Sequence, residues 1–401
     1  MSYVLLLNPI ILNKIGLPPK DIAIGTALSS ALGTLLSGCL GNLPFGLAPG
    51  IGLSTYITYS LVLNGTLSIT QAFTSAFIAG LLLWIFTITG ISNIIMKIIP
   101  KGVKVGTIIG MGLQIAFVGM TSIDLIVSNR LTLVDLGDLY DYDIWLSIAG
   151  LLLIGTLLYH EIQGSILIGI ITMTLITWSL ESSWPQQWIM IPALQNPLSH
   201  YINFSELNFQ CIPAILSFLF VGIVDLGGVI FGMASLAKLN DDNGNVPGAI
   251  YSFFGASAGT MMGAAMGSSP IIVYVESAAG IKEGGRTGFC AVIIASLFIV
   301  SVVFAPLFGD IPVTATAPVS MLVGVLMAGQ ATEINWSDMS EAIPAFLTLT
   351  LIPFSFSISN GILFGLITSS FFYISTGKLF IDIKKLADYA NNNNRYTTMS
   401  K

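Results

Sequence analysis

Apolar positions along the chain form long runs separated by short polar connections. Most runs approach the roughly 20 residues that a helix needs to cross the hydrocarbon core of a bilayer. The pattern predicts fourteen membrane segments, of which the third and the tenth are interrupted. They lie near 1–13, 21–40, 45–63, 69–90, 103–122, 144–159, 164–180, 212–236, 248–266, 267–282, 285–306, 313–329, 343–357 and 360–376. We therefore expect an all-α polytopic membrane protein.

The longest polar stretch divides these segments into two groups of seven. We predict a first seven-segment repeat at 1–180, an external linker at 181–211, a second repeat at 212–376 and a cytoplasmic tail at 377–401. The first segment is too short to cross about 30 Å as a helix. It is therefore expected to be either truncated or only partly spanning.

Composition and charge agree with a membrane protein. Apolar residues make up 54% of the chain and charged residues 8%, against about 25% charged in a typical soluble protein. With both termini cytoplasmic, eleven of the fourteen Lys and Arg residues fall on the cytoplasmic side, as the positive-inside rule expects. No basic patch suggests a nucleic-acid partner, and the Cys and His spacings indicate no metal site. The acidic loop after the fifth segment and the run at 391–394 are expected to be disordered.

Each half contains one segment broken by Pro and Gly, at 44–54 and at 267–276. Paired broken segments at corresponding positions indicate an inverted-repeat transporter, because unwound backbone offers N–H and C=O groups to a substrate near the midplane. Irregular backbone persists at that depth only where it lines a cavity or is buried in protein. The alternative is that these are kinks for tight helix packing.

Two carboxylates, Asp225 and Glu276, stand among apolar and small residues of the second half. An ionised acid at mid-bilayer costs roughly 2.5–3.5 kcal/mol on insertion scales, so such residues usually bind a substrate or carry a proton. The alternatives are that Asp225 forms only a structural hydrogen bond and that Glu276 caps the helix that follows it. Both are our main candidates for substrate binding and proton coupling.

Several stretches resemble the AzgA-like purine permeases of the nucleobase transporter superfamily, which includes uracil and xanthine/uric acid permeases. They are LAPGIGL at 47–53, FLFV at 218–221 followed by Asp225, YVESAAG at 274–280, GGRTG at 284–288, ATAP at 315–318, INW at 334–336 and EAIPAF at 341–346. The resemblance implies two inverted repeats divided into a core domain and a gate domain, with short strands in segments three and ten. It also implies proton-coupled import of adenine, guanine or hypoxanthine, with no cofactor.

The chemistry of the candidate residues suits such a substrate. A purine presents N–H donors that a carboxylate can accept in a fork, as a strong charge-assisted pair. Two acids in one pocket can share a proton, although the sequence leaves open which acid carries it. The other candidate substrate contacts lie in or near the two broken segments. These are Phe45, Gly50, Ile51, Gly52, Ser54, Phe220, Ser268, Ser269 and Tyr274.

The candidate site also departs from the pattern of the family. Many relatives have Asn where Ser54 stands, Asp where Gly222 stands, and Thr where Ile272 and Val273 stand. The alternatives are that the three candidate serines serve helix packing instead of binding and that the aromatic residues are core or lipid-facing side chains. Substrate preference is therefore left open.

Other functions remain as alternatives. A non-transporting or sensing scaffold, or a carrier of uracil, xanthine or an anion, would keep the same fold, although two buried acids argue against an anion site. An enzyme is not expected, because no nucleophile–base pair or metal cluster stands out. We expect a plasma-membrane location, and the choice between monomer and homodimer is left open.

Overall fold

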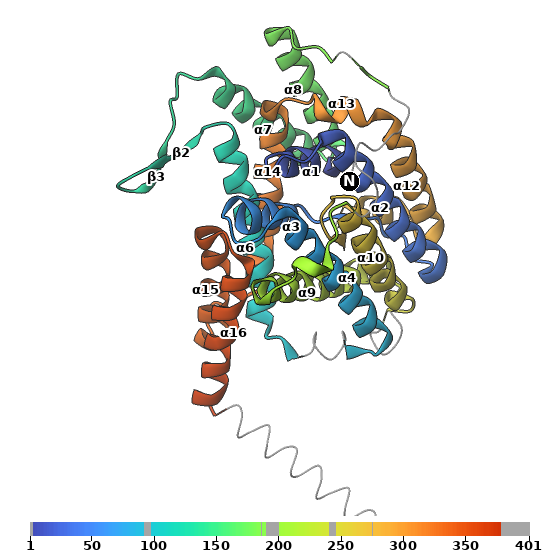
Figure 1. Cartoon of the computed structure of the whole chain (residues 1–401), viewed down its shortest axis with the longest axis vertical. Coiled ribbons are helices and arrows are strands. Elements are labelled where there is room, and N and C mark those ends of the chain that lie inside the picture. The colour runs from blue at the N-terminus through green and yellow to red at the C-terminus, as the bar shows by residue number, and fades with distance from the viewer. Residues whose placement is uncertain are drawn as a thin grey trace, which may run out of the picture.

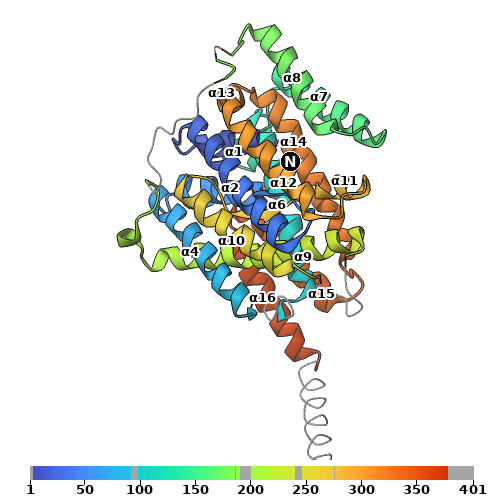
Figure 2. The ribbon, with the colours of Figure 1, turned by 90° about the vertical axis from the view of Figure 1, so that its right-hand side faces the viewer.

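The computed structural model describes residues 3–91, 98–185, 187–189, 200–239, 246–274 and 276–377. Helices make up most of it, together with two pairs of short strands. Figures 1 and 2 show the helices packed side by side into one body, with α16 descending from it. The predicted tail after residue 377, the run at 391–394 and much of the predicted external linker lie outside the described residues.

The helices of the first half follow the predicted segments. Local sequence sets several of their ends: α4 begins with a capping box, in which Ser68 and Gln71 bond each other's backbone N–H groups, and α2 ends where Asn42 adopts a left-handed conformation. The elements are α1 (Val4–Asn13), α2 (Pro19–Gly41), α3 (Ile51–Thr55) continuing as π-helix η1 (Tyr56–Leu63), α4 (Ile69–Ile88), α6 (Lys101–Ser122), α7 (Tyr142–Tyr159) and α8 (Ser165–Glu181).

The second half repeats this order after two short 3-10 turns, η2 (Phe204–Glu206) and η3 (Phe209–Cys211). Its elements are α9 (Ile212–Ala237), α10 (Ala249–Ala265), α11 (Ser277–Lys282), α12 (Gly288–Ser301), η4 (Val302–Phe304), α13 (Ala305–Gly309), α14 (Val313–Ala328), η5 (Gly329–Glu333), α15 (Met339–Ser355) and α16 (Ile358–Ser375). Within the described residues, eight helical stretches are long and apolar enough to cross a membrane, and four shorter helices are also apolar.

The two broken segments meet in a small antiparallel sheet. Strand β1 (Leu47–Pro49) precedes α3, and strand β4 (Ile271–Val273) precedes α11. The pairing is Leu47 with Val273, Ala48 with Ile272 and Pro49 with Ile271. This register is symmetric about the central pair, as two inverted repeats predict, and it confirms the expected strands in segments three and ten.

The helices pack in two groups. In the first, α2 packs against α10 and α12, and α4 packs against α10 and α9. In the second, α6 packs against α14 and α15, while α7 and α8 pack against α14 and against each other. Figure 1 places α2, α10 and α12 on the right and α6, α15 and α16 on the left. The grouping follows the predicted division into a core (segments 1–4 and 8–11) and a gate (segments 5–7 and 12–14).

Small residues allow the close approach of α2 and α10. A Cβ on Gly33 would lie 2.9 Å from the Gly255 carbonyl oxygen, and one on Gly255 would lie 2.4 Å from the Gly33 oxygen. Nearby, the hydroxyls of Ser37 and Ser252 share a hydrogen bond of 2.6 Å. Backbone approach through small residues and hydroxyl pairs is typical of helix association in membranes.

The acidic loop between α6 and α7 is not disordered, and that prediction is wrong. It forms a hairpin from β2 (Ile126–Asn129) and β3 (Leu133–Leu136), which projects from the body in Figure 1. The Asn129 side chain accepts a hydrogen bond from the Leu131 amide (2.8 Å) and donates one to Asp135 (2.8 Å). Asn and Asp form turns through such local bonds, so polarity alone did not indicate disorder here.

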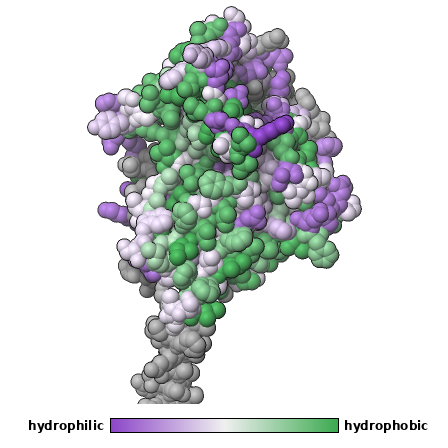
Figure 3. Space-filling view, turned by 90° about the vertical axis from the view of Figure 1, so that its left-hand side faces the viewer, coloured by the Kyte–Doolittle hydropathy of each residue, from purple (hydrophilic) through white to green (hydrophobic). Residues whose placement is uncertain are grey.

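The outer surface of the helices is apolar. Figure 3 shows hydrophobic residues spread over the middle of one face, with hydrophilic residues gathered toward its upper end and its edges. On α16, for example, Leu363, Ile367 and Phe371 are all more than half exposed. Apolar patches of this extent mark a membrane or protein contact, and together with the spanning helices they identify an integral membrane protein.

Candidate functional site

The β1–β4 crossing is held in place by a threonine from each half. Thr34 of α2 accepts from the Leu47 N–H (2.9 Å) and donates to the Leu47 carbonyl (3.0 Å). In the second half, Thr260 of α10 accepts from the Ile271 N–H (2.9 Å). Backbone N–H and C=O groups inside a bilayer need hydrogen-bond partners. The two threonine hydroxyls supply such partners where the two-stranded sheet ends.

Glu276 follows β4 and is bound by a residue from the very start of the described chain. The Tyr3 hydroxyl donates to Glu276 Oε1 at 2.5 Å. The Tyr3 ring lies 6.0 Å from that of Tyr274, whose own hydroxyl donates to the Pro49 carbonyl at 2.6 Å. Two tyrosines therefore fix the carboxylate relative to both strands.

Asp225 lies on α9, within the core group of helices, and is 7% exposed. Its neighbour Val224 packs against Ile99 and Val103 at the start of α6. Helix α9 packs against β4 and α11 and also touches gate helix α6. Asp225 therefore lies on a helix that packs against the two elements on either side of Glu276.

The three candidate serines join a buried network around Asn8 of α1. The Asn8 side chain donates to Thr26 (2.6 Å) and Ser268 (2.9 Å) and accepts from Ser54 (2.6 Å). Ser54 also shares a 2.8 Å hydrogen bond with Ser269. All five residues are fully buried. In this structure the hydroxyls bond one another and link α1, α2 and α3 to the turn before β4.

The remaining candidates lie around the same crossing. The Gly50 N–H donates to the Pro270 carbonyl at 2.9 Å. Ile51 and Gly52 open helix α3, where the first N–H groups have no partner inside the helix. Phe45 is fully buried in the core, whereas Phe220 is partly buried and packs against Val224. That these residues contact a substrate stays a prediction.

The space at the crossing is small. A void of about 10 Å³ lies between Leu53, Phe218, Gly222, Thr260 and Ile271. A Cβ on Gly222 would meet only one atom within 4 Å, so the larger residue expected there in relatives would point into this void. No flat heterocycle fits in such a space unless the surrounding helices move apart.

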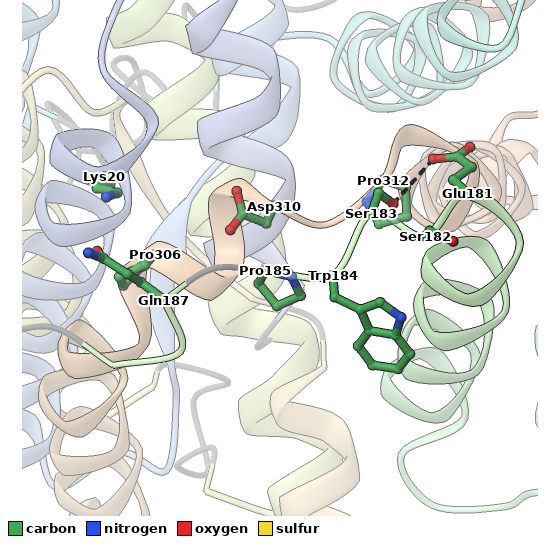
Figure 4. Close-up of a pocket in the computed structure, with 10 residues that line it drawn as sticks. All are labelled: Lys20, Glu181, Ser182, Ser183, Trp184, Pro185, Gln187, Pro306, Asp310 and Pro312. Carbon is green, nitrogen blue, oxygen red and sulfur yellow. Dashed lines mark hydrogen bonds between the residues drawn. The ribbon is translucent and has the colours of Figure 1, made fainter.

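A larger cavity of about 790 Å³ opens elsewhere, where α8 ends and α2 and α14 begin. Figure 4 shows its charged side chains, with Lys20 on one side and Glu181 on the other. Its lining contains none of the predicted site residues. The lining residues are Lys20, Glu181, Ser182, Ser183, Trp184, Pro185, Gln187, Pro306, Asp310 and Pro312.

A crossing of two broken segments beside buried acids is a transporter geometry, and comparison with known proteins gives the family. A model for xanthine/uracil permeases, described as the permease family, matches residues 1–377. The chain belongs to the xanthine/uracil permease family. The resemblance found in the sequence is thereby confirmed.

Individual relatives of this permease match over nearly its whole length. It is 38% identical over 380 residues to a putative permease of Methanocaldococcus jannaschii, covering 94% of this chain and 87% of that protein. It is 32% identical over 380 residues to the adenine permease AdeP of Escherichia coli (94% and 85% covered) and 32% identical over 387 residues to the guanine/hypoxanthine permease PbuO of Bacillus subtilis (94% and 89% covered). These relatives are transporters, so the permease is not an enzyme.

Solved structures confirm the fold. The transmembrane domain of the cyanobacterial bicarbonate transporter BicA matches with a TM-score of 0.64 at 16% identity, covering 90% of this chain and 96% of that one. The murine anion transporter Slc26a9 matches with a TM-score of 0.61 at 12% identity, covering 93% and 68%. At such identities the likeness concerns the fold alone.

Sequence reasoning missed Tyr3 and Asn8. Each is a polar side chain inside an otherwise apolar run, which is the signal that singled out Asp225 and Glu276. The first segment was judged by its length, so its polar residues received no role. In the permease they provide contacts to Glu276 and to the candidate serines.

Proposed function

We propose that this permease imports the purine bases adenine, guanine and hypoxanthine together with protons. The observation that carries the proposal is the crossing of β1 and β4 beside Asp225 and Glu276. The names of its relatives, adenine permease and guanine/hypoxanthine permease, support the substrate class. A carboxylate accepts adjacent purine N–H donors as a charge-assisted fork.

The proposed mechanism is alternating access, with the core moving against the gate. The close contact between Gly52 of the core and Met111 of the gate supports it, because a Cβ on Gly52 would already lie 3.3 Å from Met111 and a base can enter between the two groups of helices only when they separate. In this proposal Asp225 and Glu276 share a proton, which leaves on the inner side and couples uptake to the proton gradient. Which acid binds the base and which carries the proton stays open.

The proposal includes a plasma-membrane location with both termini in the cytoplasm. Its support is the placement of Lys and Arg, of which eleven of fourteen then fall inside. Cysteine labelling from the two sides of intact cells, at positions introduced in the β2–β3 turn and near residue 377, tests this orientation. Labelling of the hairpin from outside and of residue 377 only after permeabilisation is the expected result.

Uptake of radiolabelled bases tests the function. Cells lacking their own purine permeases would express the chain and receive hypoxanthine, guanine, adenine, uracil or xanthine at about pH 5.5 and about pH 7.5, spanning the range in which a shared proton can matter. Purine uptake that rises in acid supports the proposal. Absence of uptake, from protein shown to reach the membrane, would favour a non-transporting or sensing scaffold, and uptake of uracil or xanthine alone would change the substrate.

Tyr3→Phe is expected to reduce purine uptake roughly tenfold, because it removes the hydrogen bond that fixes the Glu276 carboxylate, and bonds to charged groups are among the stronger ones. Uptake kinetics at several pH values measure this effect. Tyr56→Phe is the matched control: it removes a buried hydroxyl that bonds Ser359 at 2.7 Å and no carboxylate. Equal uptake by the two variants, with the same pH profile, would contradict a role for Tyr3 at Glu276.

A further inference from the structure

One buried side chain in the described part of the permease has a conspicuous lack of partners. Gln114 of α6 is fully buried, and neither its amide nitrogen nor its carbonyl oxygen has a hydrogen-bond partner among the described residues. A carboxamide can donate two hydrogen bonds and accept two. Leaving all of them unmade in a protein interior is costly and calls for an explanation.

The neighbours of Gln114 on its helix show which side it faces. Three residues earlier, Met111 packs against α3, since a Cβ on Gly52 would lie 3.3 Å from the Met111 Cβ. Three residues later, the Phe117 ring lies 5.5 Å from that of Phe356, which lies 6.0 Å from Tyr59 of the core. Residues three apart share a helix face. Gln114 therefore lies between a contact with α3 of the core and a contact with Phe356 at the end of gate helix α15, at the edge where core and gate meet.

The other sides of α6 are occupied by gate helices. A Cβ on Gly112 would lie 2.5 Å from Met327 Cβ of α14, and one on Gly106 would lie 2.8 Å from the Ala345 carbonyl of α15. Gln114 is thus a gate residue that meets the core, the surface across which alternating access takes place.

Gln114 lies close to the strand crossing when positions are compared along the axis of α6. Gly52, opposite Met111, is two residues from Gly50, which bonds Pro270 beside β4. Gln114 is three residues beyond Met111, which is less than one helical turn, or about 5 Å along the axis. A small movement of the core along the gate would bring a base bound at the strand crossing to the same height as the Gln114 amide.

Other polar groups at this interface already have partners. The Tyr56 hydroxyl bonds Ser359 (2.7 Å), which also bonds Ser217 (2.6 Å). Thr107, two turns before Gln114, donates to the Val103 carbonyl (2.8 Å). Among the described residues of this surface, the Gln114 amide and the Tyr59 hydroxyl lack a partner, and the amide alone offers a donor and an acceptor on separate atoms.

We propose that Gln114 is a specificity-determining residue, which hydrogen-bonds the purine from the gate side during transport. An amide presents one donor and one acceptor side by side, and this pair matches the N6–H and N7 edge of adenine. In a guanine or hypoxanthine, the same edge carries two acceptors, so the amide can satisfy only one of them directly. The inference rests on the proposed purine transport and adds the residue that distinguishes one purine base from another.

Gln114→Met tests the proposal, because Met keeps the length of the side chain and removes its hydrogen-bonding atoms. We expect the KM for adenine to rise about tenfold or more, as for loss of a two-point contact, with a smaller rise for hypoxanthine. The variant should also unfold at a higher temperature than the unmodified protein in the absence of substrate, because it no longer buries an unpartnered amide. Gln114→Leu removes the same hydrogen-bonding atoms and replaces them with a side chain of a different shape.

Tyr59→Phe is the matched control, since the Tyr59 hydroxyl is also buried without a partner among the described residues, yet lies farther along the interface beside Phe356. It should leave KM and base preference unchanged. If both Gln114 variants keep the unmodified KM and preference while purines are transported, the inference is wrong and the proposed function stands. If the unmodified chain neither takes up nor is stabilised by any purine, both are wrong.

Discussion

Exchanging Asp225 for Asn is expected to reduce purine uptake by roughly hundredfold, a loss typical of a buried hydrogen bond to a charged group. The amide keeps the shape of the side chain, but it offers one acceptor atom in place of two and cannot take up a proton. Initial uptake rates at matched surface expression measure the effect. Folding should be retained, because the exchange removes a buried charge.

Asp310→Asn is the control for this experiment. Asp310 lines the larger cavity at the end of α8, away from the strand crossing, and is exposed. Its exchange should leave uptake unchanged. Undiminished uptake by the Asp225 variant would exclude that carboxylate from the transport cycle and leave Glu276, which is partly buried, as the remaining candidate.

Asn8→Ala is expected to lower the free energy of unfolding by about 2–4 kcal/mol, because it leaves several buried hydroxyls short of partners. The network it supports joins α1 to α2, α3 and the turn before β4. Equilibrium unfolding of the purified protein in mild detergent measures the change. The loss should be accompanied by reduced uptake, since Ser54 and Ser269 sit beside the crossing.

Ser37→Ala is the comparison for this prediction. It breaks one hydroxyl pair, with Ser252, between α2 and α10 of the core. A single neutral hydrogen bond contributes only about 1 kcal/mol. If the two variants lose the same stability, Asn8 does not act as a centre of the network, and its hydrogen bonds contribute no more than an isolated pair.

The membrane segments could be predicted from the sequence because a bilayer imposes a length and a polarity on every helix. The predicted interruptions at 44–54 and 267–276 became β1–α3 and β4–α11 for a related reason: Pro cannot donate to the hydrogen-bond ladder of a helix, and Gly lowers helix stability through its conformational freedom. The hairpin at 126–136 was missed because its turn depends on local bonds of Asn129, which hydropathy does not record.

The candidate site was predicted only in part. Asp225 and Glu276 are conspicuous because charge is costly in an apolar run. Tyr3 and Gln114 give a weaker signal, because an uncharged polar side chain costs less in an apolar run than a charge does, and the partner of Tyr3 lies 273 positions away. Only packing shows that the Gln114 amide is enclosed without partners among the described residues.

The strand crossing also constrains how the protein is made. Residue 48 pairs with residue 272, so β1 has no partner until the second half of the chain has left the ribosome and entered the membrane. Until then, the edge of β1 is exposed backbone, which a bilayer cannot solvate. Contacts so distant in sequence also form slowly. The first half must therefore remain incompletely folded until residues 271–273 have been made and inserted.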